Sequence, residues 1–555
     1  MSKIFEQLMR VRGIGEDFLH PKYEKLSKPE NLPDIDKAVE RLNTAKERKE
    51  KVLIYGDYDV DGVTATTILY ETLKLMGIAE VETMLPDRFK DGYGMSRRLV
   101  SRAKETGVSL VVTVDCGSNN GEIVEELNKA AVDVIVTDHH EIAGELPQAV
   151  AVVSPKREDF RRKVLDRQAQ IVANKEKLVD FSGLGELSGA GVAFMLAVAL
   201  KNAGLIPEGQ EKWLLDLAMI GTICDAMILT KDNRIICKYG AVVLSKTKRP
   251  GLMELMRVAG MNKINTEGIG FQLGPRLNAA GRMETAEIAL NLLKTKSKVK
   301  AARYAEDLNR LNAERRAQQN RAMEELASSG VGEEPVIVVK GNYGEGIVGI
   351  IAGRITEQYK RPSFVLTEVD GVLKGSGRSF GEFNLAEALK NCSEILLSGG
   401  GHAAACGMSI KQENFEEFKE RVNGYYRSLG LKNQERFLDV KEDISVSELD
   451  KLNLELMEEI AQLEPFGEGN PEPIFLLPDM FVQDAGTIGI NGKHLRILIR
   501  DDNGKTMKLV AFNAPKEWTE VRPGARVSVF TVLSENEWQG TRSVEGRILK
   551  LRVEM

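Results

Sequence analysis

Three short apolar runs in the first third of the chain each end in acidic residues, and an amphipathic stretch follows the first two. They are KVLIYGD at 51–57, LVVTVDCG at 110–117 and DVIVTDHH at 133–140. Alternation of this kind predicts an α/β domain, a parallel sheet flanked by helices. Ligands of such folds bind beyond the carboxyl ends of the strands, so polar residues from three separate segments should meet at one edge of the sheet.

The first of these strand ends carries three carboxylates on alternate residues, Asp57, Asp59 and Asp61, in the stretch GDYDVDG. Mutual repulsion and desolvation would force some of them to take up protons unless a cation lies between them. Oxygen ligands on a turn that leads into a helix are typical of a divalent cation site. We therefore interpret the three aspartates as metal ligands.

The next strand ends extend this set with Asp115 and with Asp138, His139 and His140, while Asp225 is a lone carboxylate in the apolar stretch GTICDAMIL. A mainly oxygen site with one imidazole suits Mn²⁺ or Mg²⁺ better than a structural zinc. Two such ions would lower the pKa of a shared water and hold a phosphate for in-line attack. Any one aspartate could instead cap a helix or a turn, and His139 could be a hydrogen-bonded core residue. The conjunction at successive strand ends favours a metal-dependent phosphoesterase.

The rest of the sequence predicts a helical insertion, a C-terminal barrel and the limits of five segments. A charged helical insertion is expected at 156–181, with a solvated surface as its simplest interpretation. The hairpin pattern KHLRILIRDDNGKTMKLVAF, with its DNG turn, and the strands that follow it predict a small barrel of the oligonucleotide-binding (OB) type. The predicted segments are a leader (1–45), a catalytic α/β domain (46–293), a linker helix (294–333), a second, smaller α/β domain (334–432) and a helix plus barrel (433–555).

Composition narrows the function classes. The formal net charge is −6, which gives no sign of a polyanion partner, so any nucleic-acid site must be local. No segment offers the roughly 20 unbroken apolar residues of a membrane helix, and we expect an intracellular, cytoplasmic protein without a membrane partner. Five cysteines without a CxxC pair argue against a disulfide framework and a cysteine-ligated zinc site.

With this spacing laid out, the motifs GDYDVDG, TVDCG and TDHH resemble the successive motifs of the DHH phosphoesterase superfamily. Further segments are similar, in the same order, to segments of its RecJ family of single-strand-specific DNA exonucleases: PDRFKDGYG, LSGAGVAF, QLGPRLNAAGRM, GEGIVGIIAGR, GSGRS, GGGHAAACG and PFGEGNPEP. The similarity runs from about Val52 to the C-terminus. Departures at Ser118, Asn119 and Cys406 affect none of the candidate ligands.

The resemblance implies roles for individual residues. It implies two Mn²⁺ or Mg²⁺ ions held by Asp57, Asp59, Asp61, Asp115, His139 and Asp225, with Asp57 the least certain direct ligand. His140 would face the scissile phosphate, and Asp138 would orient a histidine. The end of the strand would be held by Arg88, Arg276, Arg282, Ser376, Arg378 and His402. Arg276 and Arg282 could instead hold a helix end or an interdomain salt bridge.

The function implied is a metal-dependent 5′ to 3′ exonuclease that degrades single-stranded DNA to mononucleotides in DNA repair and recombination. The alternatives are an oligoribonuclease or cyclic-dinucleotide phosphodiesterase of the same superfamily, or a non-catalytic replication factor of the same fold. The resemblance also implies a monomer, with a single-strand-binding protein or a helicase as candidate partners. The barrel offers a basic stacking surface for DNA, or simply a solvated face or protein-binding face, through Lys493, Arg496, Arg500, Lys505, Lys508, Phe512 and Trp518.

Overall fold

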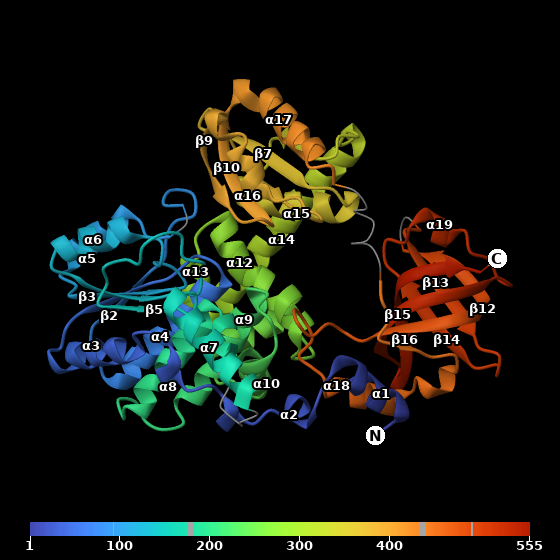
Figure 1. The fold of residues 1–555 in the computed structure, drawn as a ribbon, viewed down its shortest axis with the longest axis horizontal. Helices are drawn as coiled ribbons and strands as arrows, with labels where there is room; N and C mark the ends of the chain where they lie inside the picture. The colour runs from blue at the N-terminus through green and yellow to red at the C-terminus, as the bar shows by residue number, and fades with distance from the viewer. Residues whose placement is uncertain (93, 175–181, 432–439, 490–491, 555) are drawn as a thin grey trace. The chain divides into compact units, whose positions relative to one another are not determined.

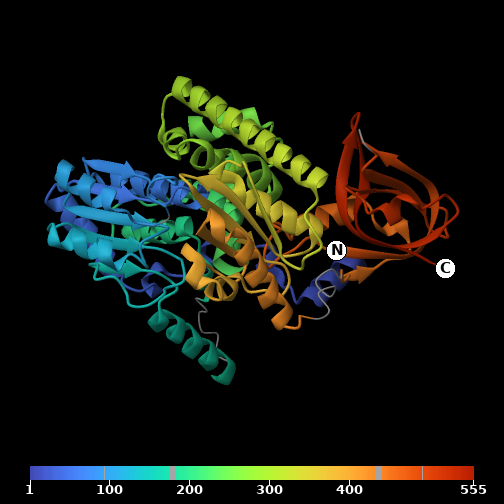
Figure 2. The same cartoon turned by 90° about the horizontal axis from the view of Figure 1, so that it is seen from above.

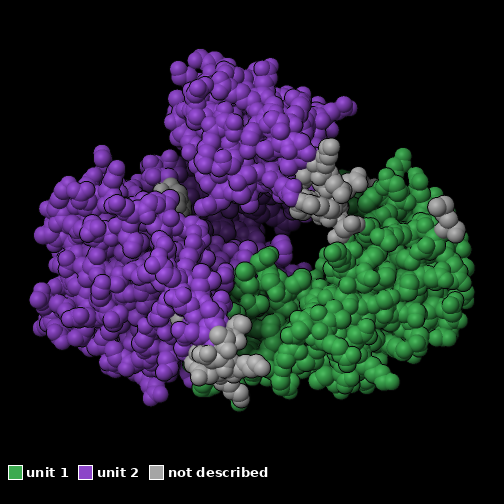
Figure 3. Space-filling view, viewed as in Figure 1, with its two compact units in different colours: residues 1–26, 228–238, 438–555 green, residues 27–227, 239–437 purple. Residues whose placement is uncertain are grey.

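The computed structural model describes residues 1–92, 94–174, 182–431, 440–489 and 492–554. It divides into two compact units (Figure 3), of which unit 2 comprises 27–227 and 239–437, and unit 1 comprises 1–26, 228–238 and 438–555. The predicted segment limits stay a prediction. The part of the predicted 156–181 insertion that is described forms helix α7, Glu158–Asn174, and positions 175–181 lie outside the described residues.

The first sheet of unit 2 is parallel throughout, in the order β2-β1-β3-β4-β5, which confirms the predicted α/β class. Val52 of β1 pairs with Val81 of β2 on one side and with Leu110 of β3 on the other. Helices α5 and α6 cover one face, and α3, α4 and α8 the other (Figure 1). Every residue of β1 and β3 is therefore buried, as expected for a sheet with helices on both sides.

The elements of this α/β region follow in chain order: α3 (Ile35–Glu47), β1 (Val52–Tyr55), α4 (Val60–Met76), β2 (Val81–Met84), α5 (Arg97–Thr106), β3 (Leu110–Val114), α6 (Gly121–Lys129), β4 (Asp133–Thr137), β5 (Ala151–Val153), α7, α8 (Gly189–Asn202), α9 (Leu215–Cys224), α10 (Lys231–Ser245) and α11 (Pro250–Ala259). A π-helix (Gly268–Leu273) then runs directly into α12 (Gly274–Met283), followed by α13 (Glu287–Lys294).

Helix α14, Lys298–Ser329, is one long helix (Figure 2) that packs against α11, α12 and α13. Ser297 caps its start by accepting a hydrogen bond from the Lys300 amide, and Gly330 ends it with a positive φ of 78°.

The second sheet of unit 2 has the order β6-β7-β8-β10-β9, with β6 and β7 parallel and the others antiparallel. Its elements are β6 (Ile337–Gly341), α15 (Val348–Tyr359), β7 (Ser363–Val369), β8 (Val372–Arg378), α16 (Leu385–Lys390), β9 (Leu396–Gly401), β10 (Ala405–Lys411) and α17 (Phe415–Ser428).

Unit 1 contains the predicted barrel. Its strands follow the order β11-β12-β13-β14-β16-β15, and an additional pairing of β12 with β15 closes the sheet. The elements are α1 (Lys3–Arg12), α2 (Glu16–Leu19), β11 (Ile444–Ser445), α18 (Leu454–Ala461), β12 (Ile474–Ile488), β13 (His494–Arg500), β14 (Thr506–Ala511), α19 (Lys516–Thr519), β15 (Arg526–Trp538) and β16 (Thr541–Val553). The predicted DNG hairpin is confirmed, because β13 and β14 pair antiparallel with Arg500 opposite Thr506.

The N-terminal helices belong to the core of this C-terminal unit. Phe5 and Leu8 of α1 are fully buried there, and Arg12 binds Asp443 through two hydrogen bonds of 2.8 Å. The segment 228–238 is fastened to the same unit through Arg234, which donates to the carbonyls of Phe18, Gln462 and Leu463. No helix in the described ranges is both long and apolar enough to cross a bilayer.

Candidate metal centre and phosphate pocket

The turn after β1 presents the three alternate aspartates at the start of α4. Asp59 caps this helix, since its Oδ1 accepts a 3.1 Å hydrogen bond from the Gly62 amide. Asp61 lies in the first turn with a buried side chain, and its two oxygens accept the amides of Gly189 and Ala190 at 2.6 and 2.9 Å. The start of α8 therefore fixes the orientation of the Asp61 carboxylate.

Asp115 follows β3 directly and has a left-handed backbone, with φ of 61°. Non-glycine residues rarely adopt this conformation, and it is found where the surrounding structure holds a functional side chain in place. The contact behind it is equally close, because a Cβ on Gly189 would lie 2.5 Å from the Cβ of Asp115. A glycine at position 189 is thus required for α8 to approach this carboxylate.

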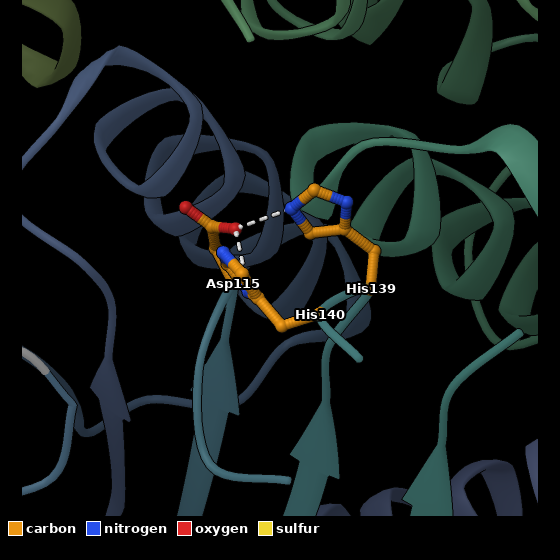
Figure 4. A group of neighbouring side chains, drawn as sticks. All are labelled: Asp115, His139 and His140. Atoms are coloured by element: carbon orange, nitrogen blue, oxygen red, sulfur yellow. Dashed lines mark ion pairs between the residues drawn. The ribbon is translucent and has the colours of Figure 1, made fainter. Parts of the chain in front are cut away.

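The histidines after β4 meet these carboxylates. The Nε2 atom of His139 lies 3.0 Å from Asp115 Oδ1, 3.5 Å from Asp225 Oδ2 and 3.6 Å from Asp61 Oδ2. Figure 4 shows both histidine rings turned toward Asp115, with Nδ1 of His140 at 3.9 Å from the same oxygen. Asp225, the C-cap of α9, brings its carboxylate to the group from a helix end.

Asp138 has a different part in this arrangement. Its Oδ1 accepts the His139 and His140 amides and contacts Nδ1 of His140 at 2.9 Å, while Oδ2 accepts the Ser118 amide. Burial alone would raise the pKa of Asp138, but these hydrogen bonds and the nearby imidazoles lower it to about 2. Asp138 is therefore a fixed anion that orients His140, whose own pKa rises to about 9 because the bond to Asp138 outweighs the effect of burial.

Several atoms of the group are buried without a hydrogen-bond partner. Within the described part of the chain these include Asp57 Oδ1, Asp115 Oδ1 and His139 Nε2. Buried polar atoms are almost always hydrogen-bonded in folded proteins, so three unpartnered atoms at one place indicate a ligand-binding site. Three overlapping sets each place one donor atom per residue within 4.8 Å of one another: Asp57, Asp59 and Asp115; Asp61, His139 and Asp225; Asp115, His139 and His140. The donor set of carboxylates with imidazole fits a divalent cation.

The electrostatics of the group agree with this chemistry. Burial, followed by repulsion from neighbouring carboxylates, raises the pKa of Asp61 to about 6 and that of Asp225 to about 8. The same causes hold the pKa values of Asp57 and Asp115 well above their ordinary range. Burial lowers the pKa of His139 to about 3, so its imidazole is neutral and free to bind a metal. Cations would remove the repulsion that these carboxylates otherwise suffer.

A group of cations forms a second element of the site. The Arg88 guanidinium lies 4.7 Å from the ring centre of Tyr58, and Arg282 donates to the carbonyl of Gly346. Arg378 donates to Ser376 Oγ at 2.9 Å and to the Gly377 carbonyl at 2.8 Å. Burial and the charges of Arg88, Arg315 and Arg378 lower the pKa of Arg282 to about 10. Arginines that repel one another form a pocket suited to a phosphate group.

The other two predicted substrate residues, Arg276 and His402, have partners of their own, and their role in binding substrate stays a prediction. Arg276 donates to Asn309 Oδ1 of α14 at 3.0 Å, and burial and then the charge of Arg316 lower its pKa. His402 is an exposed residue between β9 and β10, and its amide donates to the Ala405 carbonyl. Arg315 and Arg316 have no signal in the sequence, because a charged helix without Gly or Pro does not show which arginine lacks an acidic partner.

The residues of the basic stacking surface predicted for the barrel differ in pairing and in exposure. Arg496 and Lys508 form ion pairs with Asp484 and Glu545, and Trp518 packs against the barrel core. Of the two aromatic residues in that prediction, Phe512 is the one that lies exposed. Trp518 is only partly buried against the barrel core, so the stacking surface stays a prediction.

Comparison with known proteins gives matches to three family models. Residues 51–222 match the model described as DHH family, N-terminal domain, residues 333–428 match the DHHA1 domain, and residues 443–550 match the RecJ OB domain. These three regions include all the residues of the metal centre except Asp225, which follows the first match by three positions.

Similar proteins extend over nearly the whole chain. The single-stranded-DNA-specific exonuclease RecJ of Bacillus subtilis is 36% identical over 95% of this chain, which spans 64% of that protein's length. RecJ of Haemophilus influenzae is 30% identical, with 98% of this chain and 95% of that protein covered. The crystal structure of Thermus thermophilus RecJ in complex with Mn²⁺ superposes with a TM-score of 0.80 at 31% identity, over 99% of this chain and 75% of that one.

Proposed function

Because the chain belongs to the RecJ family of DHH phosphoesterases, we propose that it is a metal-dependent exonuclease that degrades single-stranded DNA from the 5′ end to mononucleotides. The observation that supports this most directly is the group of three buried, unpartnered atoms, Asp57 Oδ1, Asp115 Oδ1 and His139 Nε2, at the carboxyl ends of adjacent parallel strands. A ligand set of this kind holds the divalent cations that activate water in metal-dependent phosphodiester hydrolysis.

Six residues would hold the ions, which the Thermus thermophilus relative binds as Mn²⁺ or Mg²⁺: Asp57, Asp59, Asp61, Asp115, His139 and Asp225. A bound pair of divalent cations supplies a water of lowered pKa and neutralises charge on the phosphate. In the protein without metal, the hydrogen bond to Asp138 outweighs burial and raises the pKa of His140 to about 9, and an imidazolium at this position can donate to a phosphate oxygen. Asp138 keeps that imidazole oriented, which is the task of a positioning residue.

The arginine pocket would select the end of the strand. Arg88, Arg282 and Arg378, with Ser376, offer guanidinium and hydroxyl donors to a terminal 5′ phosphate. An end held at one place relative to the ions limits each cut to the first phosphodiester and releases a mononucleotide. We propose a contributory role for His402, which carries its imidazole on an exposed turn and acts electrostatically on Glu141.

The experiment that tests this proposal uses single-stranded DNA labelled separately at each end, with Mn²⁺, Mg²⁺ or EDTA. Immediate release of a mononucleotide from the 5′ label, abolished by EDTA, is the expected result. If long DNA stays intact while short RNA or cyclic dinucleotides are cleaved, the substrate belongs to the alternative phosphodiesterase class. If none is cleaved, the non-catalytic replication factor is the better account of the fold.

The cellular setting is part of the same proposal. A monomer acting in the cytoplasm on repair and recombination intermediates would receive its single strands from a helicase or from a single-strand-binding protein. Size-exclusion chromatography with light scattering tests the monomer. Stimulation of exonuclease activity by either protein, lost when Phe512 of the barrel is changed to Ala, tests the partner.

A further inference from the structure

Three arginines on α12 and α14 carry positive charge that no carboxylate balances. Most arginines of this chain form ion pairs, but Arg276, Arg315 and Arg316 have no Asp or Glu within 4.0 Å among the described residues. Arg310, on the same helix α14, shows the ordinary arrangement, with Glu284 and Glu314 as its partners. On α14, Arg315 and Arg316 therefore differ from Arg303 and Arg310, which each have an acidic partner.

Neutral oxygens hold two of these guanidinium groups in place. Helix α12 packs against α14, and Arg276 donates to Asn309 Oδ1 at 3.0 Å and to the Gln272 carbonyl at 2.8 Å. Arg315 donates to Asn312 Oδ1 at 3.2 Å and to Gln319 Oε1 at 3.3 Å. Amide oxygens orient a guanidinium without neutralising it, so these cations are positioned and still available to an anion.

The same three charges act on one another. Burial, and then the charge of Arg316, lowers the pKa values of both Arg276 and Arg315, and Arg315 also contributes to the lowered pKa of Arg282. The three arginines thus continue the pocket of Arg88, Arg282 and Arg378 along α14. One terminal phosphate does not need six arginines, and a polynucleotide supplies a phosphate at every nucleotide.

An exposed aromatic residue precedes Arg276 by five positions in the chain. Phe271 is 78% exposed within the π-helix, one residue before Gln272, whose carbonyl binds Arg276. Single π-helical turns often occur at functional sites. A solvated phenylalanine next to uncompensated arginines is the combination that proteins use for single-stranded nucleic acid, where bases stack on aromatic rings and cations follow the backbone.

We propose that Arg276, Arg315 and Arg316 form a second phosphate subsite, which binds an internal phosphate of the single strand, and that Phe271 stacks on a base next to it. This inference rests on the proposed function and adds to it a reason for preferring a polymer. A dinucleotide occupies the terminal pocket without reaching this subsite. Longer strands gain the additional contacts.

The test measures binding of a 5′-phosphorylated 20-nucleotide strand in EDTA, by fluorescence anisotropy at several salt concentrations. The double variant Arg315→Gln/Arg316→Gln should bind roughly tenfold or more weakly, and its slope of log K against log[salt] should be shallower by about 1.4, at about 0.7 for each lost phosphate contact. The control, Arg303→Gln, removes a charge from the same helix at an exposed arginine that lies 4.0 Å from Asp307. Equal losses in the control would overturn the subsite, since they would show a general effect of net charge.

Two further measurements complete the test. Phe271→Leu should bind the 20-nucleotide strand roughly tenfold more weakly than Phe271→Trp, because only the latter keeps an aromatic face; equal affinities would overturn the stacking role. In Mn²⁺, the double variant should raise KM for the long strand but not for a 5′-phosphorylated dinucleotide. If the wild-type protein cleaves from the 5′ end and the double variant keeps the wild-type slope of log K against log[salt], the second phosphate subsite is refuted while the proposed function stands. If the wild-type protein neither binds nor cleaves single strands, the proposed function fails.

Discussion

Replacing Asp225 by Asn should stabilise the protein without metal and destabilise it relative to wild type when Mn²⁺ is present. In the metal-free protein, burial and then the charges of Asp61 and Asp59 raise the pKa of Asp225 from 3.8 to about 8. Its carboxyl is ionised at pH 7 in the unfolded chain, so folding must either protonate it or confine a repelled charge. Asparagine at 225 escapes both costs.

The size of the effect follows from that pKa difference. Each pH unit between 3.8 and 7 corresponds to about 1.36 kcal/mol, which gives about 4 kcal/mol at pH 7. The Asp225 side chain is 27% exposed, and solvent screening reduces the expected gain to about 2 kcal/mol. The folded-state pKa is the raised one, so wild-type stability is fully present below pH 4 and is lost as pH rises toward 8. The variant should match wild type near pH 4 and exceed it at pH 7.

Mn²⁺ should reverse the order. Saturating ion at about 100 times its Kd stabilises a protein by about 2.7 kcal/mol, and a variant that lacks one ligand binds more weakly and gains less. The assay is urea unfolding followed by circular dichroism, for both proteins, at pH 4 and pH 7, with EDTA or with Mn²⁺.

The matched control is Asp216→Asn, on the helix that Asp225 caps. Asp216 is buried but binds the Arg249 guanidinium at 3.0 Å, so its removal leaves that cation without this partner. This control should destabilise the protein with and without Mn²⁺. If Asp225→Asn behaves in the same way, losing stability equally in EDTA and in Mn²⁺, Asp225 is a structural residue and the assignment as a ligand is refuted.

Three other outcomes are expected. Arg378→Ala should raise KM about tenfold for 5′-phosphorylated DNA and less for 5′-hydroxyl DNA. The control Lys374→Ala, also on β8 but paired with Glu345 at 2.7 Å, should change neither KM. Equal losses on both kinds of DNA end would indicate a general backbone contact. Asp138→Asn should lower kcat about 10- to 100-fold with little change in KM, since it disturbs the orientation of His140, and unchanged kcat in steady-state assays would contradict that role. Deleting 438–555 alone should cause aggregation in size-exclusion chromatography, because Phe5 and Leu8 lose the core that buries them; a monodisperse product would refute this packing.

The sequence was sufficient to predict the sheet and the meeting of acidic and histidine side chains at its edge, for a simple geometric reason. Apolar runs identify strands, and parallel strands place their carboxyl ends on one edge, so Asp57, Asp115 and His139 had to be neighbours whatever the details of the loops. The contacts of Asp138 follow equally from local chemistry, because its partners at 139 and 140 are adjacent in the chain.

Contacts between distant segments were not predictable in this way. The face of α1 that carries Phe5 and Leu8 indicates an amphipathic helix, but nothing in the pattern says that residues 438–555 cover it. The same is true of Arg234, which resembles any helical arginine in the sequence and yet is 2% exposed, with three backbone carbonyls as its partners. Such contacts have no local signal, because the chain that supplies the partner lies more than 200 residues away.

The carboxylates of the metal centre and the arginines of the phosphate pocket, both in unit 2, have a common explanation. Burial and uncompensated negative charge raise the pKa values of the carboxylates of the metal centre, and burial and uncompensated positive charge lower the pKa of Arg282 to about 10. Asp59 is close enough to act on Arg282 but does not neutralise it. A polyanion that arrives together with divalent cations satisfies both groups at once. Each group alone costs folding stability, and their proximity is the electrostatic pattern expected where a protein binds a metal-complexed phosphate.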